Sequence, residues 1–124
     1  MSNILLVFVG GGLGSIARYL MGLAATRIFG VAFPYGTLSV NVLGGLLMGL
    51  FIGWMSTRNA HPTLQLFFAT GILGGFTTFS SFTLEAVLLW QRNEPLLAAA
   101  YIAASVILAI TALCLGLYLS RFFS

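Results

Sequence analysis

Four long apolar stretches fill most of the 124 residues, at about residues 4–28, 36–55, 64–90 and 96–119. A helix needs about 20 apolar residues to cross the hydrocarbon core of a bilayer, so each stretch is long enough to span a membrane. Charged residues make up 6% of the chain, against about 25% in a soluble domain. The sequence therefore predicts an all-α membrane protein in which residues 1–124 form a single domain of four transmembrane helices.

The third stretch is interrupted at residues 74–78 by the run Gly-Gly-Phe-Thr-Thr. A helix in hydrocarbon must satisfy its backbone hydrogen bonds internally, so a break is tolerated only where it is buried in protein or lines a hydrated path. We therefore expect the third helix to be broken near its middle, and the function to lie at the break.

The charged residues exclude several classes of function. All five cationic residues are arginines scattered along the chain, and the only acids are Glu85 and Glu94. Without a basic run, the chain has no surface suited to nucleic acid. It has one His and no Asp or Lys, which leaves no cluster for acid–base catalysis or for a metal held by side chains. We expect an integral membrane protein, in contact with lipid, that is not an enzyme.

The arginines are shared almost equally between the two ends of the spans. Arg58 and Arg121 lie at the end that holds the termini, Arg27 and Arg92 lie at the other, and Arg18 is deeper within the first stretch. This distribution gives little orientational bias under the positive-inside rule. Our hypothesis is that the chain inserts both ways round, with dual topology, and forms an antiparallel homodimer about a two-fold axis in the membrane plane.

Two stripes of small residues recur at four-residue spacing in the first and second stretches. Residues four apart share one face of a helix, and small residues let helices approach closely. Polar residues within a membrane span face the protein interior. We therefore expect the polar members of the stripes, Arg18 and Asn41, to point into the bundle; the stripes are Gly10, Gly14, Arg18 and Gly22, and Asn41, Gly45, Gly49 and Gly53.

Uncharged hydrogen-bond donors are concentrated in the last three stretches. A path that they line, nearly without carboxylates, would favour a small anion. Phe76, Phe79 and Phe82 recur every three residues, and the electropositive edge of a phenyl ring can contact a partly dehydrated anion. Ordinary core packing of these rings, and hydroxyls bonded to their own helix, stay open as alternatives. The donors are Thr37, Ser39, Asn41, Thr77, Thr78, Ser80, Ser81, Thr83, Ser105 and Thr111.

The helix break also predicts a cation site. Where the first half of the third helix ends, its carbonyls lose their intrahelical donors and the negative end of the helix dipole is presented. In an antiparallel dimer the two sets of carbonyls would converge at the centre. We expect a small cation such as Na⁺ to satisfy them there, as a structural cofactor of the dimer.

Three segments of the chain resemble the Fluc, or CrcB, family of fluoride channels. They are residues 10–18 (GGGLGSIAR), 36–45 (GTLSVNVLGG) and 71–82 (GILGGFTTFSSF). The resemblance implies passive export of fluoride from the cytoplasm of a microbe, through two pores in an antiparallel dimer with a central Na⁺.

The resemblance also implies roles for particular residues. Asn41 would donate its amide hydrogens to fluoride, Arg18 would lie at the vestibule, and the backbone carbonyls of Gly74 and Thr77 would hold Na⁺. Ala109 departs from a hydroxyl found in some relatives, and Thr111 is a candidate substitute on another face. The full set of pore residues implied is Asn41, Phe79, Phe82, Ser80, Ser81, Thr83, Tyr101 and Ser105.

The main alternative function is a small dual-topology, proton-coupled transporter of multiple drugs or organic cations. Such a transporter needs a carboxylate within the membrane, and Glu85, within about two turns of the interfacial Trp90, is the nearest candidate. The transporter alternative predicts that Glu85→Gln abolishes transport of an organic cation, whereas a fluoride channel transports no organic cation. A non-conducting assembly subunit is a third alternative, and it would leave the concentration of donors unexplained.

Overall fold

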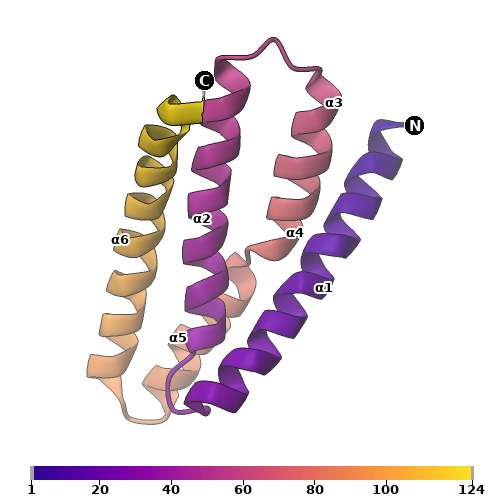
Figure 1. The fold of residues 1–124 in the computed structure, drawn as a ribbon. Helices are drawn as coiled ribbons and strands as arrows, with labels where there is room; N and C mark the ends of the chain where they lie inside the picture. The colour runs from indigo at the N-terminus through magenta and orange to yellow at the C-terminus, as the bar shows by residue number, and fades with distance from the viewer. Residues whose placement is uncertain (1, 124) are drawn as a thin grey trace.

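Four helical segments long and apolar enough to cross a membrane make up the computed structural model, which describes residues 2–123. The third segment is broken, and the chain turns sharply at the break (Figure 1). The predicted four spans and broken third helix are thus confirmed, and the antiparallel dimer stays a prediction. The elements are α1 (Asn3–Phe29), α2 (Tyr35–Ser56), α3 (Pro62–Leu64), the π-helix η1 (Gln65–Leu73), α4 (Gly74–Phe76), α5 (Phe79–Gln91), α6 (Pro95–Ser120) and the 3₁₀-helix η2 (Arg121–Phe123).

The break in the third span is narrower than the sequence indicated. The helical segments α3, η1 and α4 follow one another without interruption up to Phe76, so residues 74–76, expected in the break, are helical. Only Thr77 and Thr78 are extended, with φ/ψ of −83°/156° and −150°/119°. Glycine disfavours a helix by only about 0.5–1 kcal/mol relative to alanine, so packing can keep Gly74 and Gly75 helical.

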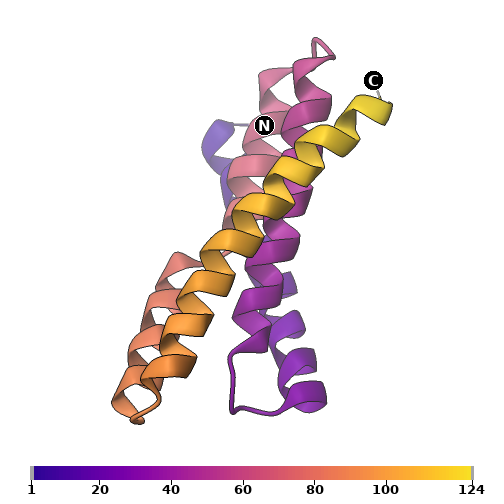
Figure 2. The ribbon, with the colours of Figure 1, turned by 90° about the vertical axis from the view of Figure 1, so that its left-hand side faces the viewer.

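The two halves of the broken span pack against different partners. The first half, α3 to α4, lies beside α1, whereas α5 turns away and lies along the first half of α6 (Figures 1 and 2). The helix α2 stands between these two pairs and packs along α6. The break therefore lies in the middle of the bundle, where α1, α2 and the third span meet.

Glycines bring the backbones of these pairs into direct contact. A methyl group on Gly14 would overlap the carbonyl oxygen of Ile72, and one on Gly49 would overlap that of Leu113. The glycines of the two predicted stripes thus form most of the α1 contact with the third span and the α2 contact with α6, except Gly22, which lies against Gly36 of α2. Arg18 and Asn41 both bond to the third span, so the prediction that they point into the bundle is confirmed.

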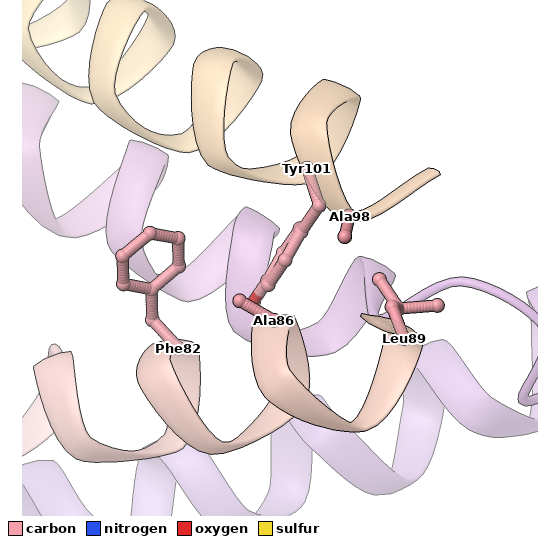
Figure 3. Packing of buried hydrophobic residues seen from close by; sticks show 5 residues of the cluster. All are labelled: Phe82, Ala86, Leu89, Ala98 and Tyr101. Carbon is pink, nitrogen blue, oxygen red and sulfur yellow. The ribbon is translucent and has the colours of Figure 1, made fainter. Parts of the chain in front are cut away.

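One cluster of buried apolar side chains lies between α5 and α6 (Figure 3). It consists of Phe82, Ala86 and Leu89 from α5 and Ala98 and Tyr101 from α6. Large apolar side chains cover much of the remaining surface of the described residues. Helices that are apolar all round are typical of a protein surrounded by lipid or by further membrane helices.

Candidate functional site

Asn41 of α2 holds the helix break from outside the third span. Its Nδ2 donates to the carbonyl oxygen of Thr78 at 3.0 Å, and the Thr78 N–H donates to its Oδ1 at 2.8 Å. The carboxamide thus replaces the acceptor that a continuous helix would have supplied to the Thr78 N–H, and it adds a donor to the Thr78 carbonyl, which as the N-cap of α5 also accepts the first bond of that helix. The resemblance implied that both amide hydrogens of Asn41 serve the ion. In this subunit one of them is engaged by Thr78, which leaves one for a ligand.

These bonds leave two carbonyls at the break without their helical donors. In a continuous helix the Thr78 N–H would donate to Gly74, but it donates to Asn41 instead. The Ser81 N–H, four residues after Thr77, donates to the Thr78 hydroxyl at 3.1 Å. The oxygens of Gly74 and Thr77 are therefore available, and they are the two that the sequence predicted as Na⁺ ligands.

The donor chemistry of the break fits a hard cation, which prefers oxygen ligands. Within residues 2–123, no group of three or more His, Cys, Asp or Glu residues could hold a metal. A cation at the break would therefore rest on backbone oxygens. Two oxygens are too few for such an ion, so a second copy of the chain would have to complete the site.

Arg18 of α1 also bonds to the break. Its Nε donates to the carbonyl oxygen of Gly75 at 3.1 Å, and the side chain is half-buried. The remainder of the guanidinium faces a cavity between α1, α2 and α5. The structure therefore gives Arg18 a bond to the backbone in addition to the vestibule position that the sequence implied.

This cavity, which we call the vestibule, has a volume of about 390 Å³. Its polar lining includes Arg18, Thr37, Ser81, Glu85 and Arg92. The hydroxyl of Thr37 donates to Oε1 of Glu85 across the cavity. Arginine side chains, hydroxyls and a carboxylate thus line one cavity within the membrane-spanning bundle.

Two buried hydroxyls lie on α6. Tyr101 and Ser105 are 0% and 6% exposed, and neither side-chain oxygen has a hydrogen-bond partner within residues 2–123. The Tyr101 ring reaches from α6 to α5 between Phe82 and Leu89 (Figure 3). A buried polar group without a partner costs about 1–3 kcal/mol, so this pair suits a small polar ligand or water.

An aromatic series leads from this pair to the surface of the subunit. The ring centroid of Phe82 is 5.3 Å from that of Tyr101 and 5.5 Å from that of Phe79. Phe82 is 9% exposed, whereas Phe79 is 76% exposed. The two phenylalanines that the sequence assigned to the pore are therefore neighbours, but only Phe82 is covered by its own subunit.

The other predicted pore residues are less enclosed. Ser80 and Thr83 are exposed, and the Thr83 hydroxyl donates to the Ser80 carbonyl of its own helix at 2.9 Å. Thr111 is also exposed. Ala109, where some relatives were expected to offer a hydroxyl, has its backbone oxygen against Gly45.

Two residues of the vestibule were not assigned to the site from sequence. Thr37 was counted only among the hydroxyls, although it lies four residues before Asn41 and so shares its helix face. Arg92 follows the last turn of α5 and was counted only as a loop charge. Its position in the vestibule depends on the turn at the break, which the sequence pattern did not fix.

Known proteins resemble this chain along nearly its whole length. A family model described as "CrcB-like protein, Camphor Resistance (CrcB)" matches residues 5–117. A protein of Mesorhizobium japonicum named "Fluoride-specific ion channel FluC" is 50% identical over 121 residues, which is 98% of both chains. Proteins of the same name from Caulobacter vibrioides and Agrobacterium fabrum are each 49% identical, and the matches cover 98% of this chain and 97% and 98% of theirs.

Proposed function

The chain belongs to the CrcB family, whose relatives are named fluoride-specific ion channels, and from that premise we propose that it is a fluoride-selective channel. It lets fluoride leave the cytoplasm passively across the cell's inner membrane. The family is one of ion channels and not of enzymes, in agreement with the scarcity of catalytic side chains.

One observation carries the proposal beyond the family name. Tyr101 and Ser105 bury two hydroxyls without partners, next to Phe82, in a protein that spans a membrane four times. Neutral hydroxyls and the positive edge of a ring can receive a dehydrated anion. The Tyr101 hydroxyl lies near Thr37 and Ser105, but within the described residues its geometry makes no hydrogen bond with either.

The chemistry suits conduction as well as binding. Moving a small ion into a medium of low dielectric costs on the order of 20 kcal/mol by the idealised Born estimate, so donors must accompany the ion along its path. Conduction also requires that no single site binds the ion too tightly. Fluoride would gather in the vestibule, where Arg18 and Arg92 contribute positive charge, and would then pass among neutral donors.

The pore residues we propose are those that the resemblance implied. Asn41 keeps one amide hydrogen for the ion, and Phe82, Tyr101 and Ser105 form the buried part of the path. Ser81 lines the vestibule, and Ser80 and Thr83 lie on the outer face of α5. The exposure of Phe79 supports an antiparallel homodimer, because a second copy would cover this ring and complete each of two pores.

A central Na⁺ belongs to the same proposal. The carbonyls of Gly74 and Thr77 lack their helical donors and lie at the negative end of a half-helix. Two copies related by a two-fold axis would offer four such oxygens to one ion. We expect removal of Na⁺ to loosen the dimer.

The test is efflux from liposomes loaded with fluoride or chloride, followed with ion-selective electrodes. We expect rapid release of fluoride and negligible release of chloride, and we expect Phe79→Ile and Asn41→Ala to abolish the fluoride signal. Equal release of both halides would remove the claim of selectivity. Release of neither halide by well-folded protein would refute the channel.

Transport measurements in the same liposomes test the cation-transporter alternative. Glu85 accepts a hydrogen bond from Thr37 in the vestibule, which gives it a role without proton exchange. We expect no proton-driven uptake of an organic cation by the wild-type protein. Uptake that Glu85→Gln abolishes would favour the transporter.

A further inference from the structure

The side chain of Arg18 crosses from α1 to the middle of the third span. Among the described residues its one hydrogen bond goes to the Gly75 backbone, at 3.1 Å across a separation of 57 residues. An arginine within a membrane span usually pairs with an acid or with backbone carbonyls. Here the guanidinium is committed to a carbonyl.

The position of Arg18 is fixed by close backbone packing. A methyl group on Gly75 would overlap the carbonyl oxygen of Gly11, and one on Gly14 would overlap that of Ile72. Arg18 follows Gly14 by one turn on the same face of α1. The bond to Gly75 is therefore set by the packing of α1 against η1 and α4.

Arg18 bonds to Gly75, which lies in the sequence between Gly74 and Thr77, the two residues whose carbonyls are available. In a continuous helix Gly75 would accept from the N–H of Phe79, and the break removes that donor; Arg18 takes its place. The peptide units that carry the oxygens of Gly74 and Gly75 both join at the Cα of Gly75. Because glycine rotates more freely than any other residue, the bond from Arg18 adds to the backbone packing against Gly11 in fixing these units.

We propose that Arg18 is a positioning residue which, through the Gly75 carbonyl, holds the oxygen of Gly74 in the position where, together with the oxygen of Thr77, it binds the central cation. This inference rests on the proposed function, in which those oxygens bind Na⁺. It differs from a role for Arg18 as an attractor of anions, which would need only its charge.

The two roles predict opposite signs for the effect on Na⁺. A positive charge beside a cation site repels the cation, so loss of the charge alone would strengthen Na⁺ binding or leave it unchanged. Loss of the bond to Gly75 would weaken Na⁺ binding. Lysine keeps the charge but lacks the planar guanidinium, so Arg18→Lys separates the bond from the charge.

Arg92 provides a matched control. It lines the same vestibule as Arg18. Its backbone N–H donates to the Leu88 carbonyl, in the last turn of the helix that it follows. Arg92→Gln therefore removes a vestibule charge without breaking a bond to the third span. It should lower fluoride flux at low ionic strength and leave Na⁺ binding as in the wild type.

The experiment measures how the thermal unfolding midpoint and the dimer fraction of the full-length protein in detergent depend on Na⁺ concentration, with N-methylglucamine as the replacement cation. We expect Arg18→Gln and Arg18→Lys to raise the half-maximal Na⁺ concentration about tenfold, the size expected for loss of one hydrogen bond to a charged group. Arg92→Gln should match the wild type.

The outcomes separate this inference from the proposed function. A wild-type Na⁺ midpoint in both Arg18 variants would overturn the inference alone, as would tighter Na⁺ binding in Arg18→Gln. Failure of both variants to fold at saturating Na⁺, while Arg92→Gln folds, would overturn it in favour of a purely structural brace. Wild-type protein that shows neither fluoride efflux nor a response to Na⁺ would instead refute the proposed function.

Discussion

Asn41 and Thr78 exchange two hydrogen bonds, so that one side chain of α2 satisfies both backbone groups of a residue in the broken third span. The donor–acceptor distances are 3.0 Å from Asn41 Nδ2 to the Thr78 oxygen and 2.8 Å from the Thr78 nitrogen to Asn41 Oδ1. This pair allows a helix to stop within the membrane without leaving Thr78 unsatisfied. It also frees Gly74, whose helical donor is the Thr78 N–H.

Asn41→Ala should therefore damage stability as well as conduction. It leaves the Thr78 N–H without a partner, at about 1–3 kcal/mol where that group is buried, and it removes one of the donors to the Thr78 carbonyl. We expect a clear drop in the thermal unfolding midpoint in detergent and loss of fluoride efflux. Ser39→Ala is the control, because within the described part of the chain the Ser39 hydroxyl bonds only to Gly36 of its own helix. Wild-type stability in Asn41→Ala would contradict the anchoring role.

The arrangement of the spans follows from patterns that a sequence displays directly. Apolar length predicts four helices, and four-residue spacing places Arg18 and Asn41 on inward faces. Both are local properties, since they depend on helix geometry and on the cost of polar groups in lipid. The helices of the structure begin and end within two residues of the ranges expected, apart from the region around the break.

The exact limits of the break depend on contacts between residues far apart. Gly74 and Gly75 are weak helix formers, so composition placed them in the break, yet α1 packs against Gly75 and both glycines stay helical. The helix ends where the Thr78 N–H donates to Asn41, which lies 37 residues earlier in the chain. The Thr37 bond to Glu85 joins residues 48 apart, and no single-helix pattern predicts such a pair.

The two pore phenylalanines should respond differently to truncation. Phe82 is buried against Tyr101, so Phe82→Ala should cost about 3–5 kcal/mol of stability. Phe79 is 76% exposed on the subunit, so Phe79→Ala should leave the subunit fold nearly intact and lower the dimer fraction. Both should reduce fluoride efflux. Unfolding midpoints and cross-linking in detergent measure these effects, and equal destabilisation by both variants would contradict them.

The glycine contacts give a prediction about packing alone. A methyl group on Gly49 would overlap the Leu113 carbonyl, whereas one on Gly12 meets nothing within 4 Å. Overpacking costs about 1–3 kcal/mol, so Gly49→Ala should lower the thermal unfolding midpoint. Gly12→Ala, its matched control on α1, should be neutral or slightly stabilising because alanine favours a helix. A stable Gly49→Ala protein would show that α2 and α6 can separate freely.

Substitution of a buried hydroxyl of α6 should affect stability and fluoride efflux in different ways. Ser105 is 6% exposed and its oxygen has no partner within residues 2–123. Since an unpartnered buried oxygen costs about 1–3 kcal/mol, Ser105→Ala should leave the unfolding midpoint unchanged or raise it. The same change removes a donor from the proposed path, so fluoride efflux should fall.

Ser120 is the matched control on the same helix. It is 3% exposed, but its hydroxyl donates to the Leu117 carbonyl at 2.6 Å. Ser120→Ala should therefore lower stability by about 1 kcal/mol, the usual net value of a satisfied hydrogen bond, and leave efflux unchanged. A stable Ser105→Ala protein with reduced efflux would indicate that the Ser105 hydroxyl serves the ion and not the fold. If Ser105→Ala were instead destabilised and conducted normally, the oxygen would have a structural partner and the path would have to run elsewhere.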